Sequence, residues 1–153
     1  MSNIHWEKIT HFEGPEYSPG FLLWQVSTKW RRQIEVALAK IGLTHPQFVL
    51  LASLGWLNRK SSDTSQVELA RHCKTDITMT SQVLRTLEKK GYVHRKLKDG
   101  NQRTKFLTVT EKGAGMIEKA IPLVESIDQQ FFKRLDTKTR KFVELLQALA
   151  LDG

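Results

Sequence analysis

The chain has 153 residues, of which 40% are hydrophobic and 26% are charged, a composition typical of a folded globular domain. It begins without the apolar run of a signal peptide, and it contains no apolar stretch near the roughly 20 residues that span a membrane. A single cysteine, Cys73, excludes an internal disulfide. We therefore expect one cytoplasmic domain over residues 1–153.

The positive charge is concentrated in the middle of the chain. Residues 59–112 contain thirteen basic and six acidic side chains, an excess of seven out of a net charge of +8. Residues 1–58 contain five basic and four acidic side chains, and residues 113–153 contain six of each. A generally basic protein with solvated lysines would spread this charge more evenly. The concentration predicts a surface that binds a polyanion, and nucleic acid first of all.

Two helices are predicted in the first third, after an irregular leader over residues 1–17. Ser18 and Pro19 have the pattern of an N-cap followed by proline at the first helical position, and Gly42 is suited to end this helix. Thr44 and Gln47 form a capping-box pattern for a second helix over residues 48–57. That helix is apolar on nearly every side, which places it at the centre of the fold.

Two further helices follow a polar loop over residues 58–64. Ser65 and Glu68 repeat the capping-box pattern and start a short helix from Gln66 to about Cys73. After a tight turn, a fourth helix is expected from about Ile77 to Lys90, with Gly91 just beyond its end. The side chains expected to be buried along this helix are Ile77, Thr80, Val83, Leu84 and Leu87.

The remainder of the chain predicts a β-hairpin and two helices. Residues 93–97 alternate in polarity, residues 106–109 are apolar and β-branched, and Asp99-Gly100-Asn101 between them is a turn sequence. A long fifth helix begins at Thr110-Glu111, with Pro122 expected to kink it, and a sixth covers about residues 138–151. The apolar stripe expected on the fifth helix is Ile117, Ala120, Val124, Ile127, Phe131 and Leu135. The fold class is therefore mainly α with a small β-hairpin.

A short helix, a tight turn, a second helix and a basic hairpin, in this order, make up a winged helix-turn-helix. In this motif the second helix presents polar side chains to base edges in the major groove, while its other face stays buried. The side chains expected to face outward are Thr78, Met79, Ser81, Gln82, Arg85 and Thr86. The hairpin is expected to follow the DNA backbone through Lys96, Lys98, Arg103 and Lys105.

Several motifs, over roughly residues 18–151, resemble the MarR family of bacterial transcription regulators. They are Gly42-Leu43-Thr44, Leu69-Ala70, the run Leu87-Glu88-Lys89-Lys90-Gly91-Tyr92-Val93, and Thr108-Val109-Thr110-Glu111-Lys112-Gly113. The resemblance implies a homodimer joined by residues 18–42 and 110–151, with residues 44–109 as the winged helix-turn-helix on a near-palindromic operator. At the tip of the wing the family usually has Asp-Arg-Arg or Asp-x-Arg, whereas this chain has Asn101-Gln102-Arg103. The resemblance implies that Arg103, and with it Gln102, contacts the minor groove. The family's aspartate, which would orient the arginine, is replaced here by Asn101.

The resemblance also implies an effector site, because many relatives bind small aromatic acids between the dimer helices and the winged domain. The matching positions here are Arg31 and Phe48, with Trp24 and Trp30 nearby, and an arginine beside aromatic rings suits a carboxylate. The alternative interpretation is that Trp24, Trp30 and Phe48 are ordinary core and interface residues. Zinc-sensing relatives use histidines of the fifth helix and peroxide sensors use a cysteine in the first, neither of which this chain has. We expect no metal and no cofactor, and a structural role for Cys73.

These observations predict a sequence-specific regulator of transcription that binds double-stranded DNA and is a ligand-responsive repressor. A winged helix also serves in some proteins as an interaction module for a protein or RNA partner, which is the alternative function. An enzyme is not expected, because the sequence contains no recognisable nucleophile, base and orienting acid and no glycine-rich phosphate loop.

Overall fold

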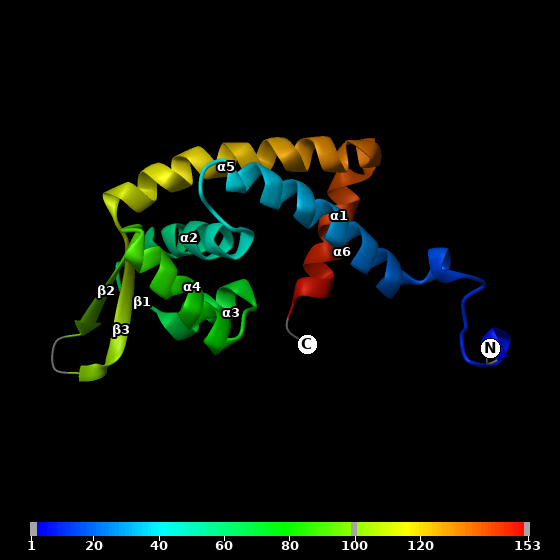
Figure 1. The fold of residues 1–153 in the computed structure, drawn as a ribbon, viewed down its shortest axis with the longest axis horizontal. Helices are drawn as coiled ribbons and strands as arrows, with labels where there is room; N and C mark the ends of the chain where they lie inside the picture. The colour runs from blue at the N-terminus through cyan, green and yellow to red at the C-terminus, as the bar shows by residue number, and fades with distance from the viewer. Residues whose placement is uncertain (1–2, 99–100, 152–153) are drawn as a thin grey trace.

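The structure of the protein, a computed structural model, describes residues 3–98 and 101–151, and the side chains of residues 98 and 101–104 lie outside that description. Asp99 and Gly100, the expected turn of the hairpin, also lie outside it. Two long helices, α1 and α5, run along the molecule (Figure 1). A compact lobe made of α2, α3, α4 and the sheet hangs below one end of this pair, and α6 folds back from the other end. Within the described residues, no helix is long and apolar enough to cross a membrane.

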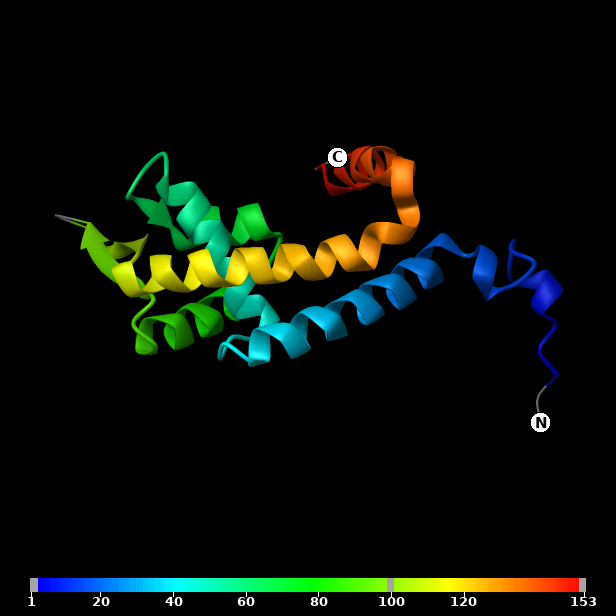
Figure 2. The same ribbon diagram turned by 90° about the horizontal axis from the view of Figure 1, so that it is seen from above.

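The N-terminal part contains two short 3-10 turns and the first long helix. The turns are η1 (Trp6–Lys8) and η2 (Pro15–Tyr17), and α1 covers Pro19–Ala39. Ser18 caps α1 as expected, because its hydroxyl accepts a hydrogen bond from the backbone N–H of Phe21 at 3.3 Å. The segment before α1 leads away from the rest of the molecule (Figure 2).

Helices α2, α3 and α4 form the lobe, and local capping explains where each begins. They cover His45–Asn58, Gln66–Cys73 and Ile77–Lys89. Both expected capping boxes are present, between Thr44 and Gln47 and between Ser65 and Glu68. Helix α2 contacts α1, α3, α4, α5 and two strands, which confirms its central position. Trp56 near its end is exposed, however, and stacks under the guanidinium of Arg59.

The sheet has three antiparallel strands in the order β1-β3-β2. The expected hairpin is β2 (Val93–Lys98) with β3 (Asn101–Val109), paired from Val93 with Val109 to Leu97 with Lys105. The third strand, β1 (Thr64–Ser65), pairs with β3 through Thr64 and Leu107 and was not expected from the sequence.

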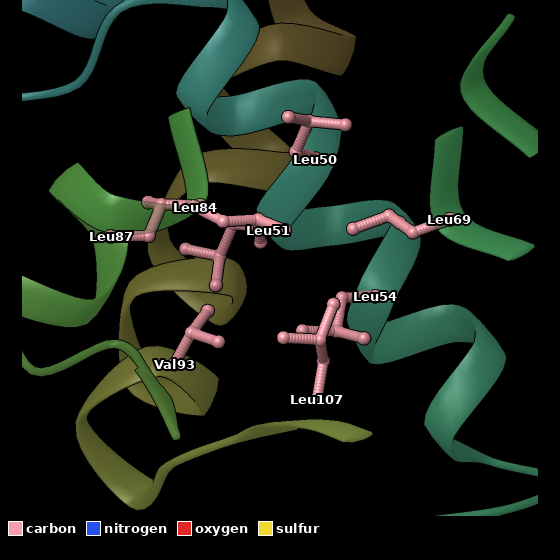
Figure 3. Packing of buried hydrophobic residues seen from close by; sticks show 8 residues of the cluster. All are labelled: Leu50, Leu51, Leu54, Leu69, Leu84, Leu87, Val93 and Leu107. Atoms are coloured by element: carbon pink, nitrogen blue, oxygen red, sulfur yellow. The ribbon is translucent and has the colours of Figure 1, made fainter. Parts of the chain in front are cut away.

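One apolar cluster holds the lobe together. Its side chains come from α2, α3, α4, β2 and β3 and point toward one another (Figure 3). Its members are all at most 3% exposed: Leu50, Leu51, Leu54, Leu69, Leu84, Leu87, Val93 and Leu107. The contribution of α4, Leu84 and Leu87, fixes which side of this helix faces inward and therefore which side faces solvent.

A second cluster joins the lobe to the long helices. Helix α5 covers Glu111–Phe132, continues through Pro122, and is followed by η3 (Lys133–Lys138) and α6 (Thr139–Ala150). The buried members of the cluster come from α1, the α1–α2 turn and α5: Ile34, Leu38, Leu43, Ala120 and Val124. Tyr92 and Met116 pack against both clusters and so connect them.

Two of the expected buried stripes are partly wrong. Ile77 is 50% exposed, because it occupies the first turn of α4, which projects beyond the core. Leu135 lies in η3 rather than on α5, because the helix ends at Phe132 and the chain turns at Asp136, whose φ is 48°. The remaining expected positions on α4, Thr80, Leu84 and Leu87, are fully buried, and Val83 is partly buried.

Asn58, the last residue of α2, ties three elements together. Its amide nitrogen donates to the hydroxyl of Thr64 and the carbonyl of Leu107, both at 3.2 Å, and its amide oxygen accepts from the N–H of Val109 at 2.9 Å. We expect Asn58→Ala to lower the free energy of unfolding by about 1–3 kcal/mol, because it leaves several of these partly buried groups without a partner. Urea denaturation measures this. Asn58→Asp keeps the acceptor for the Val109 N–H but turns a second oxygen toward the carbonyls of Ser61 and Leu107, so it should not restore the stability of the parent.

Candidate nucleic-acid interface

The turn between α3 and α4 is held by side-chain hydrogen bonds. Lys74 ends α3 in the left-handed conformation, with φ at 58°. The Asp76 carboxylate accepts from the N–H of Met79 at 2.7 Å and so caps α4, a role that the sequence interpretation missed although Asp is a favoured N-cap residue. Beneath the turn, the fully buried Thr80 hydroxyl donates to the Asp76 carbonyl and lies 2.7 Å from the Thr75 hydroxyl. The angle between the two helices is thereby fixed from inside.

Only some of the α4 side chains that were expected to face outward are exposed. Thr78, Gln82 and Arg85 are exposed, whereas Met79, Ser81 and Thr86 are half-buried. The hydroxyl of Thr86 donates to the carbonyl of Gln82 within the helix, at 3.4 Å. The three exposed side chains are therefore the ones best placed to reach a ligand.

A shallow groove of about 280 Å³ runs between the beginnings of α3 and α4. It is lined by four of the residues that the sequence predicted on the outward face of the helix: Thr78, Ser81, Gln82 and Arg85. Two further residues, Gln66 and Ile77, complete the lining: Gln66, Ile77, Thr78, Ser81, Gln82 and Arg85. Gln66 was missed because it lies on the neighbouring helix, and Ile77 because an apolar residue in a helical stripe was read as core. A glutamine amide and an apolar side chain suit base edges and thymine methyl groups, respectively.

The hairpin presents two of the expected basic residues. Lys96 and Lys105 are both exposed. Lys96 pairs with Phe106 and Leu97 with Lys105, so the two lysines extend from opposite faces of the hairpin. Leu97 beside Lys105 is 55% exposed, although the alternating pattern grouped it with buried Val93. The side chains of Lys98, Gln102 and Arg103 lie outside the described part of the chain.

Several basic residues of the central region serve the fold itself. The Lys90 ammonium donates to the Gly42 carbonyl at 2.6 Å and to the amide oxygen of Gln47, and the Lys112 ammonium donates to the Lys90 carbonyl at 2.9 Å. Arg95 is largely buried, with its Nε 3.6 Å from the Glu88 carboxylate at the end of α4. The charge available to a polyanion is therefore smaller than the count over residues 59–112 indicates.

The three residues expected to bind an effector have different surroundings. Trp24 is 69% exposed on α1, and Arg31 is exposed two helical turns further along the same face. Phe48 on α2 is half-buried and packs against the second cluster. The indole of Trp30 donates to the Asp128 carboxylate at 2.7 Å and packs edge-on against the His45 ring at 5.1 Å.

His45 is a buried titratable group at this junction. Burial and the nearby Arg31 guanidinium lower the pKa of His45, and the carboxylates of Glu35 and Asp128 oppose this shift only in part. The imidazole of the folded protein is therefore more often neutral near pH 6 than that of the unfolded chain.

This shift predicts how stability depends on pH. Above the ordinary histidine pKa of about 6.5 both states hold His45 neutral, and the free energy of unfolding does not depend on it. As the pH falls below that value, the unfolded chain binds a proton first, so stability falls until the folded-state pKa is passed. Urea denaturation between pH 7 and pH 5 should show this decline, and His45→Gln should flatten it. His72→Gln, which changes an exposed histidine on α3, should keep the decline seen in the parent protein.

Cys73 is partly buried at the end of α3, against the first cluster. Burial raises the pKa of its thiol, and a hydrogen bond with Ser53 opposes this in part. The thiol is therefore a poor nucleophile at neutral pH. Among the described residues, no group of three or more histidine, cysteine, aspartate or glutamate side chains is arranged to hold a metal ion.

The chain is similar in sequence to a known protein family and to individual proteins of known sequence. The model of the MarR family matches residues 43–105. The chain is 44% identical over 138 residues to the uncharacterized HTH-type transcriptional regulator YdcH of Bacillus subtilis, covering 90% of this chain and 93% of the relative. It is 33% identical over 134 residues to the HTH-type transcriptional repressor Rv2887 of Mycobacterium tuberculosis, covering 87% of this chain and 94% of the relative.

Solved structures agree with the sequence relatives. Rv2887 in complex with DNA matches with a TM-score of 0.69 at 32% identity, over 88% of this chain and 98% of that one. A mutant MarR of Escherichia coli complexed with operator DNA matches with a TM-score of 0.74 at 26% identity, over 87% of this chain and 93% of that one. The winged helix-turn-helix, with its buried and outward faces of α4, agrees with these matches in sequence and in fold. The chain therefore belongs to the MarR family, whose members are DNA-binding transcription regulators and not enzymes.

Proposed function

We propose that the protein is a homodimeric repressor that acts in the cytoplasm, binds a near-palindromic operator in double-stranded DNA, and releases it when a small aromatic acid binds. The outward face of α4 carries the proposal: Thr78, Gln82 and Arg85 are exposed directly opposite Leu84 and Leu87 in the core. A surface built to dock a protein would be apolar at its centre. This face instead carries hydroxyl, amide and guanidinium groups, which suit base edges and phosphates.

The dimer is proposed from the apolar side chains that the protomer leaves uncovered. Helix α6 contains no buried residue, and Leu149 is 79% exposed. The exposed apolar residues of this helix and its end are Val143, Leu145, Leu146, Leu149 and Leu151. A stripe of this length normally marks an interface. A twofold axis through this end of the molecule would direct two copies of α4 toward one side of a DNA duplex.

Selection of DNA fragments by the purified protein tests the operator. We expect the selected sequences to contain an inverted repeat whose half-site centres lie about 10–10.5 base pairs apart, since two symmetric recognition helices enter successive major grooves. Sedimentation equilibrium at micromolar concentration should give twice the protomer mass of 17.6 kDa. Selected DNA without an inverted repeat, or a protein that stays monomeric, would contradict this docking scheme.

The effector is proposed from relatives and from residues on α1 and α2. Rv2887, at 31% identity and a TM-score of 0.66, has been solved in complex with salicylic acid. In this chain Arg31 supplies a cation, and Trp24 on the same face of α1 and Phe48 on α2 supply aromatic rings. An effector releases DNA only through its different affinity for the DNA-competent and incompetent states, and tenfold release requires a difference of about 1.4 kcal/mol.

Titrating salicylate against a preformed protein–DNA complex tests the effector site. Release at millimolar acid is expected, with a weaker response in Arg31→Ala because the carboxylate loses its partner. The matched control is Arg32→Ala, which removes another exposed arginine from a different side of α1. Release that both variants leave unchanged would remove Arg31 from the site.

A further inference from the structure

The segment before α1, residues 3–17, is an arm that the protomer leaves largely without contacts. Both views show it leading away from the body of the molecule (Figures 1 and 2). Its second turn, η2, packs against the start of α1, and among the described residues η1 packs extensively against no other element. Even so, the arm carries five large exposed side chains: Ile4, Trp6, Ile9, Phe12 and Tyr17. Trp6 is 63% and Ile9 is 69% exposed, so this apolar surface has no cover within one copy.

The arm continues an apolar surface on α1. The first turns of that helix expose Phe21, Leu22, Leu23, Trp24 and Val26. Val26 also lines a groove of about 480 Å³ between α1 and the α5–α6 corner, where α5, η3 and α6 meet. Four further apolar side chains line this groove: Phe131, Phe132, Leu135 and Phe142. Lys29 and Arg134 add positive charge to it, so the groove is both apolar and basic.

The charge of the arm is opposite to that of the α5–α6 corner. Residues 3–17 contain Glu7, Glu13 and Glu16 against one lysine. Between described residues, the only ion pair of the arm is internal, from His5 to Glu7 at 3.4 Å. At the corner, Arg140 and Lys141 pair with Glu144. The other cations there, Lys133, Arg134 and Lys138, are exposed and have no acidic partner among the described residues.

We propose that the arm of each copy docks on the α5–α6 corner of the other copy. The aromatic and aliphatic side chains of the arm would enter the apolar groove, and its glutamates would face Lys133, Arg134 and Lys138. A twofold dimer makes this contact twice, so both arms are covered at once. The inference rests on the homodimer of the proposed function and adds a second contact to the one made by α6.

Two charge-reversed variants of the full chain test this docking. One carries Glu7→Lys, Glu13→Lys and Glu16→Lys in the arm, and the other carries Lys133→Glu, Arg134→Glu and Lys138→Glu at the corner. Each variant alone has like charges at both contacts, so we expect its dimer dissociation constant at about 50 mM salt to rise at least about tenfold. All six positions are exposed in the protomer, and the far-ultraviolet circular dichroism should stay that of the parent.

Mixing the two variants distinguishes contacts between copies from contacts within one copy. In the mixed dimer every arm meets a corner of opposite charge on its partner, so sedimentation should show dimers as stable as those of the parent. A contact within one copy would remain repulsive in the mixture. Lys60→Glu, an exposed charge reversal before β1, should leave the dissociation constant unchanged.

Other outcomes would contradict either the docking of the arm or the homodimer itself. If neither variant weakens the dimer, or if mixing fails to restore it, the docking of the arm on the corner is wrong while the dimer itself stands. If the parent protein is monomeric at micromolar concentration, the homodimer of the proposed function is wrong and the docking falls with it.

Discussion

Gly113→Ala is expected to lower the free energy of unfolding by about 3 kcal/mol, the upper end of what overpacking costs. Gly113 is buried in the first turn of α5, where that helix passes closely over the sheet. A Cβ atom at this position would overlap the carbonyl oxygen of Tyr92 and lie 2.9 Å from Cγ1 of Val109. Both obstacles are held in place. The Tyr92 carbonyl accepts from the N–H of Thr110 at 3.0 Å, and Val109 pairs with Val93 and donates its N–H to Asn58. The backbone has little freedom to make room.

Gly115→Ala is the matched control, two residues along the same helix. A Cβ atom there would meet nothing within 4 Å, and the position is exposed. Alanine is the better helix former by about 0.8–1.0 kcal/mol, so this variant should be more stable than the parent. Thermal denaturation gives the comparison, with roughly 2–4 °C expected for each kcal/mol in a chain of this size. Equal melting temperatures for the two variants would mean that the helix shifts freely over the sheet.

Gln82→Ala is expected to weaken binding to the selected operator by about 1–3 kcal/mol and to relax the preference at one position in each half-site. Gln82 is exposed in the middle of the outward face of α4, and its amide is able to pair with an adenine through two hydrogen bonds. The loss should be small on DNA that lacks the operator, because a base contact adds nothing there. Binding titrations on the operator and on its single-base variants measure both effects.

Lys96→Ala on the hairpin is the matched comparison. An exposed lysine beside the DNA backbone contributes a phosphate contact, so its loss should weaken binding about equally on all sequences and reduce the salt slope by about one. Repeating the titrations from 50 to 200 mM salt separates the two variants. If Gln82→Ala also lowers affinity equally on every sequence, the glutamine contacts phosphate rather than a base.

Helix starts and the order of elements were predictable because their signals are local. Ser18, Thr44 and Ser65 each accept a hydrogen bond from a backbone N–H three residues further on, and such contacts are readable from spacing alone. Strand β1 was not predictable in this way. Its two residues pair with β3 more than forty positions later, and Asn58, which holds both, has the appearance of an ordinary loop residue.

The candidate site was predictable as a face but not in its details. Helical spacing placed Thr78, Gln82 and Arg85 on one side of α4, where the structure has them. Spacing carries no information about what a neighbouring helix adds, so Gln66 was missed. A charge count likewise does not distinguish Lys90, which closes the α1–α2 turn through the Gly42 carbonyl, from a lysine free to meet phosphate.

The close approach at Gly113 joins α5 to the lobe, so a tilt of α5 would carry the lobe with it. Helix α5 has 22 residues and is about 33 Å long. If a partner copy holds its α6 end, a tilt of only about 5° at that end carries the lobe sideways by about 3 Å, close to the 3.4 Å rise of one base pair. In the proposed complex, this displacement would shift each α4 by about one base-pair step along the groove. In the proposed dimer, an effector bound near α1 would need to cause only such a tilt to move both copies of α4 out of register with their half-sites.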